Sequence, residues 1–155
     1  MILRQYLHTD PVIAVSYLFG CGGHAAGAVV DPMGEPGRYL EAAAAVGLRL
    51  RYVIDTHVHA DHLSAGRELA AAAGAEYILH DSAGARFPFR VVEDGAVLPL
   101  GNVDARVLER RFNRAFSLMD EEPFVRLMLQ EIPPRPERTR EIRAANLGLP
   151  LPVEA

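Results

Sequence analysis

The chain has 155 residues and a net charge of −4, which allows one domain with a hydrophobic core but is short for two. Half of its residues are hydrophobic and 23% are charged, and this acidic balance argues against a nucleic-acid-binding protein, which needs a basic face. The longest apolar stretch, residues 12–19, is too short to cross a membrane. The single cysteine, Cys21, allows no internal disulfide, so we expect a cytoplasmic protein without membrane association.

Strands and helices alternate through the first half of the chain. Apolar, β-branched runs bounded by Gly, Pro and Asp predict strands over residues 2–7, 12–19, 28–31, 48–55 and 76–80. Alanine-rich segments followed by Gly47 and Gly74 predict helices over residues 38–46 and 64–73. This order favours an α/β fold in which helices pack against a sheet.

The second half is less regular. Residues 91–100 and 103–108 predict a strand pair that turns at Gly101-Asn102. Residues 109–116 favour a helix or irregular structure, Asp120 is a candidate helix cap, and residues 137–146 predict a last helix ended by Gly148. We therefore expect a single domain over residues 1–148, made of an N-terminal half (1–109) and a C-terminal helical piece (110–148), followed by a loose tail (149–155).

Four metal-ligand side chains lie within six residues after a buried strand: His57, His59, Asp61 and His62. In an extended segment His57 and His59 point to the same side, and a turn into the following helix brings Asp61 and His62 toward them. Imidazole and carboxylate together suit zinc or iron. The spacing therefore predicts a metal site formed by these four residues.

The other candidate residues carry weaker signals. His8, His24 and His80 each stand alone, so we interpret them as surface or hydrogen-bonded histidines, with His24 the least improbable extra ligand because its Gly-rich loop could lie near the site. We interpret Cys21 as buried packing rather than a nucleophile. Asp31 and Asp55 end apolar strands, where each could orient a histidine ring or simply cap a turn. The glycines of residues 20–27 lack the pattern of a nucleotide-binding loop.

Residues 55–66, Asp-Thr-His-Val-His-Ala-Asp-His-Leu-Ser-Ala-Gly, resemble the metallo-β-lactamase superfamily, most closely its persulfide dioxygenase branch, with glyoxalase II thioester hydrolases as near relatives. Residues 17–32 and the C-terminal residues 111–148 are similar to the same branch. The resemblance implies an αββα sandwich. In the dioxygenases His57 would be one of the two His ligands that hold a single iron with one Asp; in the hydrolases His57 and His59 would hold one metal, and Asp61 and His62 a second.

The chain departs from this pattern after residue 108. Family members have a second His-containing loop and a Gly-Asp element that supplies a carboxylate ligand, whereas no histidine follows His80 here. We infer a large internal deletion near residues 109–111 and a truncated sandwich that lacks much of its second half. Such a loss would leave apolar surface and a strand edge uncovered, which a homodimer could cover; aggregation is the alternative.

The resemblance implies three functional alternatives. The first is oxidation of glutathione persulfide by dioxygen at non-haem iron, giving sulfite and glutathione, with activity impaired by the missing ligands. The second is a zinc-dependent thioester hydrolase of the glyoxalase II type. The third is a non-catalytic, degenerate fragment, which predicts substoichiometric metal and no oxygen uptake with persulfide.

Overall fold

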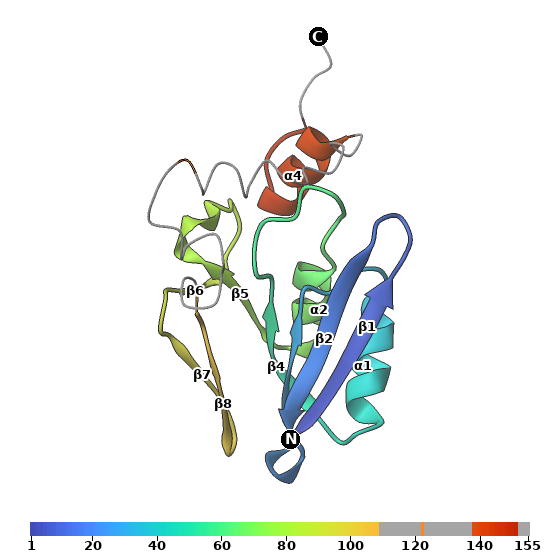
Figure 1. The fold of residues 1–155 in the computed structure, drawn as a ribbon, viewed down its shortest axis with the longest axis vertical. Helices are drawn as coiled ribbons and strands as arrows, with labels where there is room; N and C mark the ends of the chain where they lie inside the picture. Colours follow the sequence, from blue (N-terminus) through green and yellow to red (C-terminus); the bar gives the residue numbers. More distant parts are fainter. Residues whose placement is uncertain (109–121, 123–137, 152–155) are drawn as a thin grey trace.

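The computed structural model describes residues 1–108, 122 and 138–151 and contains two β-sheets (Figure 1). The larger sheet has the order β1-β2-β3-β4-β5-β6. Its strands are β1 (Ile2–His8), β2 (Ala14–Cys21), β3 (Ala26–Val30), β4 (Arg49–Ile54), β5 (Glu76–His80) and β6 (Arg90–Val92). The smaller sheet is a hairpin of β7 (Val97–Leu100) and β8 (Val103–Arg106).

The larger sheet changes character at β3. Strands β1, β2 and β3 pair antiparallel, whereas β3, β4, β5 and β6 pair parallel. Helix α1 (Pro36–Ala44) connects β3 to β4, and α2 (Gly66–Ala73) connects β4 to β5. Parallel neighbouring strands need such crossover connections. The alternating strands and helices predicted from the sequence therefore indicated this half of the fold correctly.

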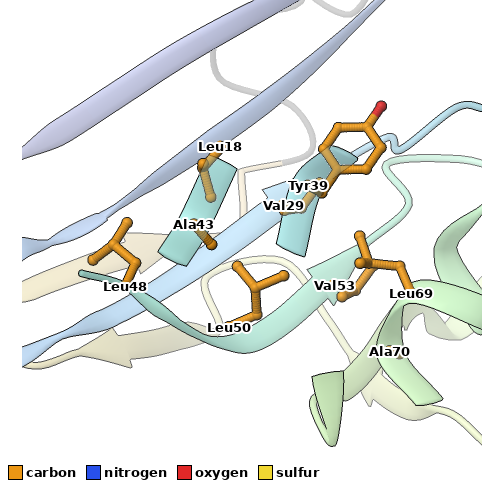
Figure 2. Packing of buried hydrophobic residues seen from close by; sticks show 9 residues of the cluster. All are labelled: Leu18, Val29, Tyr39, Ala43, Leu48, Leu50, Val53, Leu69 and Ala70. Atoms are coloured by element: carbon orange, nitrogen blue, oxygen red, sulfur yellow. The ribbon is translucent and has the colours of Figure 1, made fainter. Parts of the chain in front are cut away.

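Side chains alternate between two hydrophobic layers on opposite faces of the larger sheet. On one face α1 and α2 cover the sheet, and Figure 2 shows their side chains meeting those of the strands. This first layer consists of Leu18, Val29, Tyr39, Ala43, Leu48, Leu50, Val53, Leu69 and Ala70. The second layer faces the β7–β8 hairpin and consists of Ala28, Tyr52, Ile78, Val92, Leu98 and Leu100. Burial on both faces explains the nearly continuous apolar runs of β3 and of residues 52–54 at the end of β4.

Most predicted elements are confirmed with small shifts at their ends. Helix α2 begins at Gly66 rather than Ser64, because Ser64 pairs with Met33 in an isolated β-bridge and its hydroxyl accepts a hydrogen bond from the Gly66 amide. The predicted last helix is α4 (Thr139–Leu147), and Gly148 adopts a left-handed conformation at its end as predicted. Gly74 ends α2 in the same way.

The single strand predicted over residues 91–100 is wrong. The chain turns between Glu93 and Ala96, with Gly95 at φ +81, so that β6 stays in the larger sheet while β7 joins the smaller one. The sequence Glu-Asp-Gly is typical of a turn, but the apolar residues on both sides of it favoured one continuous strand.

Several predictions lie outside the described residues. These are the helical or irregular segment 109–116, the cap at Asp120, the junction near residues 109–111 and most of the tail. The division of the domain at residue 109 stays a prediction for the same reason, as does the homodimer. In the described part of the chain, every helix is too short or too polar to cross a lipid bilayer.

Candidate metal centre

The predicted ligands lie on the loop between β4 and α2, at the carboxyl end of the parallel strands. Asp31 follows the neighbouring strand β3, and its amide donates to the carbonyl of Ile54 at 2.8 Å. Further along, the Ala65 amide donates to the carbonyl of Pro32 at 2.9 Å. The two strand-end loops are thus joined at both ends, which is where open α/β sheets place their ligand sites.

The structure brings all four predicted ligands together and adds Asp31. Two groups of three side chains have potential ligand atoms within 4.8 Å of one another: Asp31, His57 and His59, and His59, Asp61 and His62. The ring centroids of His57 and His59 lie 4.3 Å apart, and those of His59 and His62 lie 4.2 Å apart. His59 belongs to both groups and therefore stands at the centre of the site.

A chain of hydrogen bonds selects the tautomer of a neutral His57. Thr56 donates to Asp31 twice, from its amide to Oδ1 and from its hydroxyl to Oδ2, both at 2.7 Å. The hydroxyl has only one proton to give, so the 2.9 Å contact between Thr56 Oγ1 and His57 Nδ1 requires the ring nitrogen to donate. A neutral His57 consequently keeps an unprotonated Nε2, the form that binds a metal.

His62 and His59 each present a buried nitrogen without a hydrogen-bond partner among the described residues. His62 Nδ1 lies 3.0 Å from Asp61 Oδ1 and donates to it, which leaves Nε2 as the unpartnered atom. His59 Nε2 lies 3.3 Å from Asp31 Oδ1, close enough for an ionic contact but without a hydrogen bond. Both histidines are only 4% exposed. Because buried imidazole nitrogens normally have a partner, this arrangement fits a bound metal cation.

The charges around His59 favour a positive charge at the site. Burial by itself would lower the pKa of His59, but Asp31 and Asp55 outweigh it and raise this pKa above its usual value. Burial would likewise raise the pKa of Asp31, yet the contact with His59 and the hydrogen bonds from Thr56 hold it below its usual value. The site thus keeps an ionised carboxylate beside an imidazole and attracts a cation, either a proton or a metal.

Asp55 has a different environment from Asp31. Tyr77 donates to Asp55 Oδ2 at 2.6 Å, while Asp55 Oδ1 is buried without a hydrogen-bond partner among the described residues. Burial raises the pKa of this carboxyl group. Of the two carboxylates predicted to orient a histidine or cap a turn, Asp31 therefore contacts a histidine, whereas Asp55 is hydrogen-bonded to a tyrosine.

The remaining histidines lie outside both groups of potential ligands. His8 is buried and its Nε2 lies 2.7 Å from Ser16 Oγ, which confirms a hydrogen-bonded role. His24 is exposed and lies against Gly101 in the turn of the smaller sheet. His80 contacts Ser82 through its Nδ1. Cys21 is buried, as predicted.

Three residues that hold the loop were not predicted from the sequence: Thr56, Tyr77 and Asn146. Thr56 directly precedes the first histidine, and this position was the available signal. The Asn146 side chain bonds to residues 59, 62 and 64, more than 80 positions away in the chain. No local pattern could have revealed such a contact.

A cavity of about 590 Å³ lies beside His57, between the larger sheet and the β7–β8 hairpin. Its lining is mainly apolar and includes Phe19, Ile54, Leu79 and Leu98. Arg106 and Arg143 also line it. An apolar space with two arginines at its wall therefore borders the candidate site at His57.

The comparisons with known proteins agree with this geometry. The profile of the metallo-beta-lactamase superfamily matches residues 9–148. A hydroxyacylglutathione hydrolase of Rhodospirillum rubrum is 36% identical, and the match covers 66% of this chain and 41% of the hydrolase. A hydroxyacylglutathione hydrolase of Anaeromyxobacter dehalogenans is 43% identical, and the match covers 46% of this chain and 27% of the hydrolase. The crystal structure of ETHE1 from Myxococcus xanthus is 30% identical with a TM-score of 0.60, over 67% of this chain and 46% of that one.

These relatives fit the glyoxalase II and ETHE1 branch that residues 55–66 resemble. The chain spans less than half the length of each of them. This partial coverage, together with the α/β architecture, confirms the predicted truncated fold.

Proposed function

Because the chain belongs to the metallo-β-lactamase superfamily, we propose that it binds one metal ion at its histidine-rich loop and acts on a glutathione-derived sulfur compound. The ligands are drawn from the two groups that share His59, namely Asp31, His57, His59, Asp61 and His62. The observation that carries this proposal is the pair of buried nitrogens, His59 Nε2 and His62 Nε2, that face one site without hydrogen-bond partners among the described residues. Burying two such groups is costly unless a ligand satisfies them.

The ligand geometry favours a single metal ion. His59 is shared by both three-residue groups, and one imidazole nitrogen binds one ion at a time. The described residues therefore offer one three-ligand site rather than two independent ones. Asp31, His57 and His59 form a set of two histidines and one carboxylate, which suits non-haem iron. Iron held there would supply open positions for a persulfide sulfur and dioxygen.

The reaction that we propose is oxidation of glutathione persulfide, the activity implied by the resemblance to persulfide dioxygenases. The protein's own contribution is to hold Nε2 of His57 unprotonated through Thr56 and Asp31. The cavity beside His57 offers an apolar lining for the substrate, and Arg106 and Arg143 at its wall would attract carboxylates. Because the chain lacks the later ligands of the family pattern, we expect weak metal binding and impaired turnover.

A zinc-dependent thioester hydrolase is the second candidate. It is favoured by the curated relatives, which are named hydroxyacylglutathione hydrolases at 36% to 43% identity. The stoichiometry separates the candidates, because the first needs one iron and the second two zinc ions. A degenerate fragment without catalysis is the third outcome, with substoichiometric metal and no substrate turnover.

Metal analysis of the purified protein tests the proposal. We expect about one equivalent of metal after reconstitution with ferrous iron, and oxygen uptake with glutathione persulfide. His57→Ala should lose most of this metal, because removing even a group that only hydrogen-bonds to a ligand lowers metal affinity about 10- to 100-fold. The matched control is His24→Ala, an exposed histidine outside both ligand groups, which should keep it. Full metal content in His57→Ala would show that the site is assigned incorrectly.

A further inference from the structure

The side chain of Asn146 connects the last helix to the loop that carries the histidines. Its Nδ2 donates to the carbonyl of His59 at 3.1 Å and to the carbonyl of His62 at 2.8 Å. Its Oδ1 accepts a hydrogen bond from the Ser64 amide at 3.0 Å. A single carboxamide thus bridges three backbone positions across the turn of the loop.

The partners leave only one orientation for this carboxamide. Two of them are carbonyls, which can only accept, and the third is a backbone N–H, which can only donate. Both amide hydrogens and the oxygen of Asn146 are therefore used. A side chain that lacks either the donors or the acceptor cannot replace this set of bonds.

Helix α4 holds Asn146 in place through separate contacts. The carbonyl of Leu147 accepts a hydrogen bond from the Arg86 amide at 2.9 Å, and Gly148 lies so close to Phe87 that an added Cβ would be 2.9 Å from its ring. Leu147 and Ala144 are both buried. In Figure 1 this helix lies beside the loop that follows β4. Asn146 is thus anchored on a docked helix.

We propose that Asn146 is a positioning residue for the metal site, so that metal binding depends on the docking of α4. The inference rests on the proposed metal-binding function. Two of the three bonded groups are the carbonyls of His59 and His62, the residues whose Nε2 atoms lack hydrogen-bond partners among the described residues. Fixing these backbone positions fixes the points from which both rings extend and so limits where their Nε2 atoms can lie. By linkage, metal binding must in turn stabilise the docked position of α4.

Two substitutions at this position separate its possible roles. Asn146→Asp is nearly isosteric but places an acceptor against two carbonyls, whereas Asn146→Ala removes all three bonds without adding charge. We expect metal affinity, measured by competition with a chromophoric chelator, to fall about 10- to 100-fold in both variants. The Co²⁺ absorption spectrum should also change in shape, because the ligand geometry is altered. The matched control is Asn102→Asp, at an exposed turn, which should leave affinity and spectrum unchanged.

Thermal unfolding of the metal-free proteins shows whether each variant folds. If Asn146→Asp does not fold, the Asn146→Ala variant and hydrogen exchange of the wild type test whether Asn146 positions the metal site. Zn²⁺ should slow amide exchange in residues 139–147 as well as in residues 57–64. Unchanged affinity and spectrum in a folded Asn146→Ala variant, or protection confined to residues 57–64, would overturn the inference while leaving the metal site intact. A wild type that binds no metal would overturn the proposed function as well.

Discussion

The two sheets of this molecule support their hydrophobic layers very differently. The larger sheet packs its first layer against two helices, and Leu18, Val29, Val53 and Leu69 are completely buried there. The smaller sheet has only two strands. The second layer, which it forms with the larger sheet, is equally well buried, with Tyr52, Ile78 and Leu100 at 0% exposure, but this layer borders a cavity of about 590 Å³. Two helices thus cover the first layer, whereas the second layer borders a cavity.

This difference bears on the histidine-rich loop, which is the candidate metal site. The loop begins at β4, ends at α2 and is joined to the end of β3, all of which belong to the helix-covered side. The ligands that the family pattern places later in the chain would come from the other side. The internal deletion that we infer would therefore change the number of ligands and the substrate space more than the position of residues 57–62.

Matched leucine substitutions in the two layers should give the largest difference in unfolding free energy between the two sides of the larger sheet. Leu69→Ala removes a fully buried side chain from the first layer and should cost about 3–5 kcal/mol of unfolding free energy. Leu98→Ala removes a 2% exposed side chain that already borders the cavity, so we expect about 2 kcal/mol. Urea denaturation in the presence of a chelator measures both values. Equal costs would mean that the two layers are equally well packed.

Two buried tyrosines on opposite faces of the larger sheet provide a finer comparison. Tyr39 donates to Met33 O at 2.9 Å or Ser16 Oγ at 3.0 Å and accepts from the Met33 amide at 3.0 Å, whereas Tyr52 has a buried hydroxyl without a hydrogen-bond partner among the described residues. Both residues are 0% exposed. Tyr39→Phe should therefore destabilise the protein by about 1–2 kcal/mol, while Tyr52→Phe should be neutral or stabilising.

Thermal or urea unfolding of the two phenylalanine variants decides this comparison. The Tyr39 hydroxyl holds the turn that follows Asp31, so its loss should also weaken metal binding. A larger destabilisation for Tyr52→Phe than for Tyr39→Phe would contradict the hydrogen-bond assignment on which the comparison depends.

Sequence patterns predicted the helix-covered side better than the other. Strands β3 to β5 and both crossover helices were predicted because buried parallel strands and amphipathic helices carry strong periodic signals. The turn at Gly95 was missed because apolar residues flank it on both sides, and the assignment of β6 and β7 to different sheets depends on tertiary packing. Periodicity cannot encode which sheet a short strand joins.

The candidate site shows the same limit. The histidines and Asp61 were predicted together because they are close in the chain. The participation of Asp31 depends on β3 and β4 being neighbours, and the bonds of Asn146 depend on where α4 docks. The sequence therefore predicted the ligands on one loop, and the structure was needed for the groups that orient them.

The smallest expected effect concerns the pH dependence of His8, which supports the turn after Asp31 from the helix-covered side. Burial, followed by the charge of Arg38, lowers the pKa of His8 below its ordinary value of 6.5. The folded state then binds fewer protons than the unfolded state, so this contribution to stability is present above about pH 6.5 and is lost as the pH falls toward the folded-state pKa.

Without metal, the unfolding free energy of the wild type should decrease more between about pH 7.5 and 5.5 than that of His8→Gln, which keeps a neutral donor. The opposite contribution of His59, whose pKa is raised, is common to both proteins and cancels in the difference. Parallel curves for the two proteins would mean that His8 titrates alike in the folded and unfolded states, and its hydrogen bond to Ser16 would then contribute no pH sensitivity to the turn.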